Sequence, residues 1–251
     1  MKHPILLFCA IALALFSASF TKPIPLSWPQ VFENETVTQH VAYSTLYNHS
    51  AHQPLWVAYT ITPESITGSA ERTNKFIKDP AISPATCVTG DYAKSGFDRG
   101  HLAPAADMKF SEQAMKESFY MSNICPQRPG LNRLIWKSLE TQVRNWAKLS
   151  KSIFVVAGPI FAKDIPHETI GKKNKIFVPE YFFKALLDTN GRDRMIGFIF
   201  KNTSSNLSIS DHAVTVDKIE ESIGRDLFPQ LPIKLQEKLE SEVKLESWFK
   251  P

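Results

Sequence analysis

The chain has 251 residues, of which 43% are hydrophobic and 22% charged, as is usual for a soluble globular protein. It contains no internal repeat and no low-complexity segment, which excludes repeat proteins and leaves one sizeable domain or two small ones. The formal net charge of +4 favours a polyanionic partner without demonstrating one.

The first 19 residues have the features of a secretory signal peptide. Lys2 gives a short positive region, and Ile5 to Phe16 is an unbroken apolar run of 12 residues, too short for a comfortable membrane span. Small residues follow, and cleavage near Ser19 is expected. An uncleaved anchor is the alternative. We therefore expect export to the periplasm or the medium, with no membrane association beyond this segment.

Strands and helices are predicted in an irregular order after a proline-containing leader at 20–35. Val41 to Tyr47 and Leu55 to Ile61 should pair as strands, and 62–90 should be mainly loop. Further strands are predicted at Ile153 to Ala157, Ile176 to Val178, Phe182 to Leu187 and Met195 to Phe200. Helices are predicted at Glu112 to Tyr120, Leu131 to Lys148, Thr215 to Ile223 and Ile233 to Leu245.

This order predicts the α+β fold class, because the even βαβ alternation of a parallel sheet is missing. We expect a mainly antiparallel sheet with helices on its faces. The helix at 131–148 has one apolar face, since its apolar residues recur at steps of three or four. No break in composition marks a second domain. We therefore predict a single domain over 20–251, with its core at about 40–230.

The residues with chemical potential gather between Gly96 and Arg144. Cleavage of a phosphodiester needs a base that works near neutral pH, cations for the phosphorane, and a proton or metal for the leaving 3′ oxygen. His101 suits the first task, and the guanidinium of Arg99 could grip phosphate oxygens. The amide oxygen of Asn132 is an acceptable ligand for the hard ion Mg²⁺.

Glu140 lies eight residues beyond Asn132, about 12 Å along a regular helix and about 80° around it. Both side chains cannot easily reach one ion, so Glu140 fits better as an outer group that holds water around the ion. Arg144 lies one turn further and can pair with that carboxylate and also face phosphate. Asn132 could instead be an ordinary N-cap, and Glu140 with Arg144 an ordinary surface pair.

Asp98-Arg99-Gly100-His101, followed by Leu102-Ala103-Pro104, resembles the signature of the DNA/RNA non-specific endonuclease family, which are ββα-metal or His-Me finger enzymes. Further ordered matches extend the resemblance over roughly residues 40 to 230. They are Ser122-Asn123-Ile124 with Pro126-Gln127, then Asn132, Trp136, Leu139 and Glu140, then Val178-Pro179, Tyr181-Phe182-Lys184, Val216-Asp217-Ile219-Glu220 and Phe228-Pro229.

The resemblance implies an αβα layered fold around an antiparallel sheet, with a ββα-metal motif. It implies an endonuclease that cuts DNA and RNA, depends on Mg²⁺ with Mn²⁺ as a substitute, and leaves 5′-phosphate ends. His101 would be the general base, Asn132 the direct metal ligand and Glu140 an outer-shell group.

The resemblance also implies how substrate is held. Arg99 would contact phosphate, Arg72 would stabilise the transition state, and Asn123 would position substrate or support the site. Gln127, in the second conserved segment, joins Arg144 as an expected substrate contact. The pattern implies nothing about oligomeric state.

Two other functions stay open on the sequence alone. One is a catalytically inactive relative that only binds nucleic acid. The other is a zinc enzyme using His49 and His52, whose spacing is a weak signal without a His-Glu-x-x-His helix. Cys87 and Cys125 could form a disulfide or remain buried thiols, and neither belongs to a Cys-x-x-Cys pair. Nucleotide-binding glycine loops and a Gly-x-Ser-x-Gly elbow are absent from the sequence.

Overall fold

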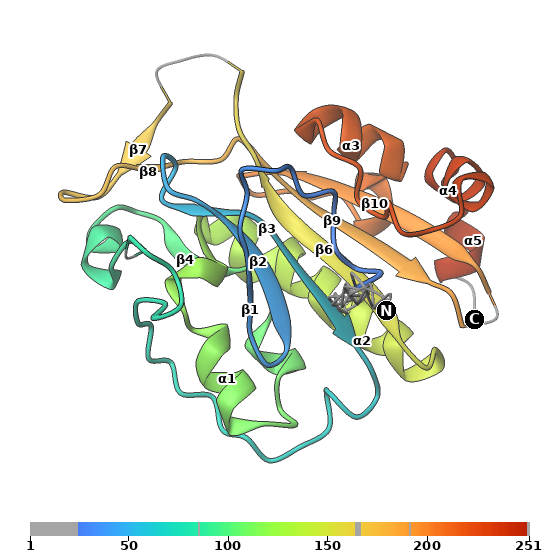
Figure 1. The fold of residues 1–251 in the computed structure, drawn as a ribbon, viewed down its shortest axis with the longest axis horizontal. Coiled ribbons are helices and arrows are strands. Elements are labelled where there is room, and N and C mark those ends of the chain that lie inside the picture. The colour runs from blue at the N-terminus through green and yellow to red at the C-terminus, as the bar shows by residue number, and fades with distance from the viewer. Residues whose placement is uncertain (1–24, 85, 164–166, 191, 250–251) are drawn as a thin grey trace, which may run out of the picture.

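The computed structural model describes residues 25–84, 86–163, 167–190 and 192–249. Its centre is a seven-stranded sheet in the order β1-β2-β3-β6-β9-β10-β11, in which all neighbouring strands are antiparallel (Figure 1). The strands are β1 (Val37–Gln39), β2 (Tyr43–Asn48), β3 (Gln53–Ile61), β6 (Ile153–Ile160), β9 (Tyr181–Asp188), β10 (Arg194–Lys201) and β11 (Ala213–Val214). The predicted α+β class with an antiparallel sheet is confirmed.

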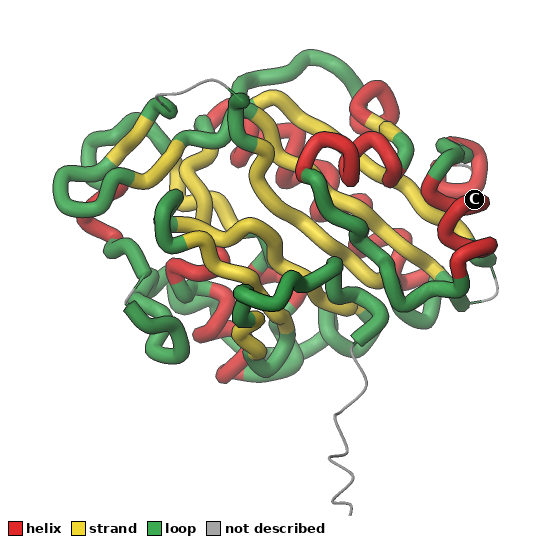
Figure 2. Tube along the Cα trace, turned by 45° about the horizontal axis from the view of Figure 1, so that its top comes forward, coloured by secondary structure: helices red, strands yellow, loops and turns green. Residues whose placement is uncertain are grey.

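Helices cover both faces of this sheet, as the tube view shows from a second direction (Figure 2). On one face α2 (Lys137–Leu149) shares an apolar core with Phe182 and Leu186 of β9. On the other face α3 (Val216–Ile223) and α4 (Ile233–Glu240) share a second core with Phe183 and Leu187. Successive residues of a strand point to opposite faces, so one strand supplies both cores. The αβα layering is confirmed.

Two short sheets lie outside the main one. β4 (Asp98–His101) pairs with β5 (Ile124–Gln127), and β7 (Thr169–Ile170) pairs with β8 (Ile176–Phe177). The predicted hairpin of β2 and β3 is confirmed, with Tyr43 opposite Tyr59. In the described part of 62–90, the chain is loop apart from a bridge at Ile77 and the start of the 3-10 helix Thr89–Tyr92, as predicted.

Helix boundaries follow the sequence at some ends and not at others. α1 (Glu112–Ser118) and α3 lie where predicted, and α3 begins after the N-cap Thr215 and ends at Gly224 in the left-handed conformation. The prediction of one helix over 233–245 is wrong, because α4 ends at Glu240 and α5 (Leu245–Phe249) is separate. Trp248 of α5 reaches the core on the α2 side instead.

The helix predicted over 131–148 is also not uniform. Its first part, η4 (Leu131–Trp136), is π-helical, and α2 continues from Lys137. A π-helix bonds i to i+5 and winds more slowly than an α-helix. The regular α-helix assumed between Asn132 and Glu140 is therefore wrong for residues 132–136.

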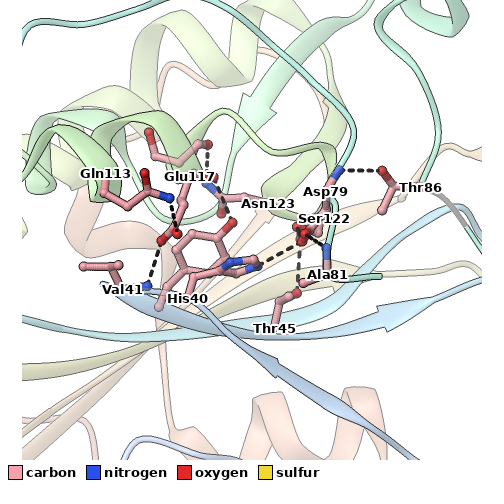
Figure 3. A network of polar contacts seen from close by, with 12 residues as sticks. His40, Val41, Thr45, Asp79, Ala81, Thr86, Gln113, Glu117, Ser122 and Asn123 are labelled. Atoms are coloured by element: carbon pink, nitrogen blue, oxygen red, sulfur yellow. Dashed lines mark hydrogen bonds and ion pairs between the residues drawn. The ribbon is translucent and has the colours of Figure 1, made fainter. Parts of the chain in front are cut away.

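A buried polar network anchors the segment that precedes β5 (Figure 3). His40 Nε2 lies 2.9 Å from Asp79 Oδ2, and the hydroxyl of Ser122 donates to the same oxygen. The backbone N–H of Ala81 donates to the other carboxylate oxygen at 2.9 Å. Asp79 lies between the histidine and the serine, so this is a structural clamp and not the serine–histidine pair of a nucleophilic triad.

The structure bears on the predictions about membrane association, the signal segment and the cysteines. No helix in the described residues is long and apolar enough to cross a membrane. The predicted signal segment 1–19 lies outside the described residues. Cys87 and Cys125 are both buried and free, which agrees with the buried-thiol alternative and not with a disulfide.

Candidate active site

A ββα unit carries the predicted chemistry. β4 and β5 form its hairpin, with His101 opposite Ile124 and Asp98 opposite Gln127, and η4 with α2 supplies the helix. A glycine is required at position 100 of β4, because a Cβ there would lie 2.1 Å from the side-chain oxygen of Gln127 on β5. The indole of Trp136 donates to the backbone oxygen of His101 at 3.2 Å, which ties the helix to the end of β4.

His101 is held as a neutral imidazole. It is 8% exposed, and its ring packs edge-on against Phe119 at 4.9 Å and in a tilted arrangement against Phe76 at 5.4 Å between centroids. Burial, aided by the positive charge of Arg72, lowers its pKa to about 3. Its Nε2 has no hydrogen-bond partner among the described residues. The imidazole is therefore uncharged at neutral pH and has a nitrogen lone pair left for a proton, although a pKa this low makes it a weaker base than one that titrates near pH 7.

A loop segment at 69–77, in which Asn74 has a positive φ of 51°, brings the guanidinium of Arg72 towards the His101 ring. Its side chains at 69, 71, 73, 75 and 77 line a cavity of about 1020 Å³ against α1. The intervening Arg72 and Phe76 face the other way. The guanidinium of Arg72 lies 5.0 Å from the centre of the Phe119 ring, and that of Arg99 lies 4.6 Å from Phe76. The structure therefore brings Arg72, Arg99 and His101 around one pair of phenylalanines.

The amide of Asn132 is oriented by a residue that the sequence reasoning gave no role. Its nitrogen donates to Asp98 Oδ2 at 3.0 Å. Asp98 also accepts two hydrogen bonds from Arg133, at 2.8 and 2.7 Å. Because the amide nitrogen is used, the amide oxygen is the atom left to face a cation. This oxygen donor fits Mg²⁺, which prefers oxygen ligands.

Glu140 is half-buried and lies in a group of charged side chains that includes the buried Asp107 and Lys184. Burial raises its pKa, and the negative charge of Asp107 adds to this, while Lys184, Arg144 and Arg72 oppose it. The expected pairing of Arg144 with Glu140 is not found, because Arg144 Nη1 donates to Asp107 Oδ1 at 2.9 Å. Glu140 has no salt bridge among the described residues and lies near a second acid, Asp107, so its carboxylate is suited to the neighbourhood of a metal ion.

Lys184 is the residue of this group that the sequence reasoning missed. It is fully buried in β9, on the α2 face of the sheet. Its ammonium donates to the backbone oxygen of Leu102 at 3.2 Å and lies 4.7 Å from the Trp136 ring centre. It therefore supports the residue that follows His101. A lysine within an apolar strand, Phe182 to Leu187, was the available signal.

Asn123 and Gln127 lie below the surface. Asn123 accepts from the backbone N–H of Ala103 at 2.8 Å and donates to the oxygens of Ala103 and Ser118, both at 2.8 Å. Of its two predicted roles, this geometry favours supporting the site. Gln127 is 0% exposed, and both its amide atoms lack a hydrogen-bond partner among the described residues. Substrate could reach it only after a local rearrangement.

His49 and His52 do not form a recognisable zinc site. Both lie in the turn between β2 and β3, and His52 has a positive φ of 54°. Within the described residues, the one group of at least three histidine, cysteine or acidic side chains that could share an ion is elsewhere, on α3 and α4. The zinc alternative therefore gains no support.

Comparison with known proteins agrees with the geometry. The family model "DNA/RNA non-specific endonuclease" matches residues 30–233. The mitochondrial nuclease of Saccharomyces cerevisiae is 37% identical over 223 residues, which is 80% of this chain and 68% of that protein. Endonuclease G, mitochondrial, of Homo sapiens is 30% identical over 204 residues, which is 76% of this chain and 68% of that protein.

A solved structure extends the comparison to the fold. A chain of the EndoG/EndoGI complex matches with a TM-score of 0.72 and 29% identity, over 79% of this chain and 88% of that chain. The sequence match, the layered fold and the ββα unit point to one assignment. The chain belongs to the DNA/RNA non-specific endonuclease family and is a hydrolase of phosphodiester bonds.

Proposed function

We propose that this enzyme is a magnesium-dependent endonuclease that cuts DNA and RNA without regard to sequence and leaves 5′-phosphate ends. The observation that carries the proposal is the state of His101, which is neutral, nearly buried and unpaired at Nε2 among the described residues. Asn132, with its amide oxygen left available by Asp98, supports the metal. The family name supports the substrate class.

In this proposal each group has one task. His101 accepts the proton of the attacking water, and the guanidinium groups of Arg99 and Arg72 neutralise phosphate oxygens. Asn132 holds the ion, with Glu140 in its outer surroundings. Mg²⁺, when bound, supplies charge that stabilises the phosphorane and the departing 3′ oxygen. No group has a role that needs a 2′ hydroxyl, which is why we expect both DNA and RNA to be cut.

The test compares wild type with His101→Ala on supercoiled plasmid and on RNA, with Mg²⁺ or with chelator. We expect wild type to cut both substrates only with metal, and the variant to be slower by about 10² to 10⁴-fold. Binding measured by fluorescence anisotropy should change little. Binding without metal-dependent cleavage in wild type would instead support an inactive relative. End-labelling of the products checks the predicted 5′ phosphate.

Cellular location is a separate part of the proposal. Several relatives are named as mitochondrial. Residues 5–16 here form an unbroken apolar run with no arginine, whereas mitochondrial transit peptides are amphipathic and rich in arginine. We therefore propose export to the periplasm or the medium. Fractionation of the native host and N-terminal sequencing of the mature protein test this, and protein retained inside with an intact N-terminus would contradict it.

A further inference from the structure

Three carboxylates meet on the face of the sheet opposite α2. Asp217 and Glu220 lie one turn apart on α3, and Glu240 is the last residue of α4. One oxygen from each lies within 4.8 Å of the other two. These residues lie outside the ββα unit and have no role in the chemistry predicted from the sequence.

Glu240 is the unusual member of this group, because its carboxylate is buried and one of its oxygens has no hydrogen-bond partner among the described residues. It is 5% exposed, and its Oε1 accepts no hydrogen bond from the described residues. Glu220, by contrast, accepts the backbone N–H of Leu227 at 2.8 Å. Lys218, the basic residue on the same turn of α3, pairs with Glu221 and not with the group. A buried carboxylate aimed at two others needs a proton or a cation.

Electrostatics agree with this geometry. Burial, followed by the negative charges of Glu220, Asp226 and Asp217, raises the pKa of Glu240 to about 8. Burial also raises the pKa of Glu220 to about 7, and the charges of Asp226 and Asp217 add to this. Every charged neighbour that shifts these two pKa values is itself acidic. A divalent ion would remove this repulsion, whereas a proton would remove only part of it.

We propose that Asp217, Glu220 and Glu240 bind one divalent cation of the calcium class, which joins α3 to α4. Ca²⁺ takes about six to eight oxygen ligands in a flexible geometry and accepts several carboxylates, whereas Mg²⁺ is usually bound through one or two carboxylates and keeps several waters. A group of three carboxylates whose oxygens all lie within 4.8 Å of one another therefore suits Ca²⁺ better than Mg²⁺. Water would complete the coordination on the side of Asp217, which is exposed.

This ion would stabilise the fold and take no part in cleavage. α3 and α4 cover the core that contains Ile219 and Leu239, on the face of the sheet opposite the one that α2 covers. The site therefore differs from the proposed magnesium site in place, ligand set and role. Its test needs no nuclease activity, so a failure here would leave the proposed function standing.

The experiment uses full-length Asn132→Ala protein, in which the proposed catalytic ligand is removed. Equilibrium dialysis with ⁴⁵Ca²⁺ at pH 7.5 should show one bound ion in this protein and none after adding Glu240→Gln. Glu221→Gln, which removes an exposed carboxylate of α3 outside the group, is the matched control and should keep the ion. The melting temperature should rise by about 5 to 10 °C at 100 times the Kd, except in the Glu240→Gln protein.

Two results would overturn the inference. One is binding of Ca²⁺ that Glu240→Gln leaves unchanged, because the ion would then lie elsewhere. The other is that no variant binds Ca²⁺ at millimolar concentration. In that case Glu240→Gln should raise the melting temperature in chelator above pH 7. That outcome would mean that the carboxylates share a proton.

Discussion

The interaction between Asp98 and Asn132 gives a sharp prediction about metal affinity. Asp98→Ala removes the acceptor that orients the Asn132 amide, so nitrogen and oxygen can exchange places and the ion loses a fixed ligand. A hydrogen bond to a charged group contributes about 1.5 to 3 kcal/mol, equivalent to about 10- to 150-fold in affinity. The Asp98 side chain is 17% exposed, so solvent weakens this bond and we expect the lower end, about tenfold.

The assay is the Mg²⁺ concentration that gives half-maximal plasmid nicking. Arg133→Ala is the control, because it removes the other partner of Asp98 and leaves the bond to Asn132. Arg133 is 67% exposed, so losing its ion pair should shift the Mg²⁺ midpoint by less than about fivefold. An unchanged midpoint in Asp98→Ala, or an equal shift in both variants, would refute the reasoning.

The pH range of this effect follows from the state of Asp98. Burial alone would raise its pKa, but hydrogen bonds from Arg133 and Asn132 outweigh burial, and the pKa lies below the ordinary value of 3.8. A depressed carboxyl pKa means that the interaction is complete above the ordinary value and is lost as pH falls through the folded value. The difference between Asp98→Ala and wild type should therefore be constant from pH 5 to pH 9.

Three further outcomes are expected. The pKa of His101 is lowered to about 3, so the free energy of unfolding of wild type should fall relative to that of His101→Asn as pH drops from about 6.5 towards 3. Urea unfolding at pH 7 and at pH 4.5 measures this, and the same decrease in both proteins between the two pH values would contradict it. Lys184→Met leaves the Leu102 oxygen without its donor and should cost about 1 to 3 kcal/mol in urea unfolding, whereas a stabilised variant would argue against a supporting role. Arg99→Ala should reduce the slope of log Kd against log salt by about one, and an unchanged slope would remove Arg99 from the phosphate contacts.

Much of the fold could be predicted because its local signals agree with its tertiary structure. The apolar periodicity that predicted the long helix belongs to the side chains that α2 buries, and Thr215 with Gly224 bounds α3. The β2–β3 hairpin follows from its β-branched and aromatic residues. The Asp98 to His101 signature predicted the strand that carries the base.

The missed features depend on contacts between residues far apart in the sequence. Arg144 was expected to pair within its own helix, but the partner is Asp107, 37 residues earlier. Lys184 reaches Leu102 across 82 residues. The π-helical start at η4 is a change of hydrogen-bond pattern that an apolar periodicity does not report. Such pairings need the folded arrangement of sheet and helix.

The side chains of residues 69–77 alternate between the cavity against α1 and the side of His101, and this alternation constrains how many residues the segment can gain or lose. Inserting or deleting a single residue before Arg72 would swap its two sets of side chains, and Glu71 or Thr73 would then face the imidazole in place of a guanidinium. A carboxylate there would favour a charged imidazolium and repel phosphate. Homologues that keep the arginine should therefore vary this segment in steps of two residues, or place odd changes outside it.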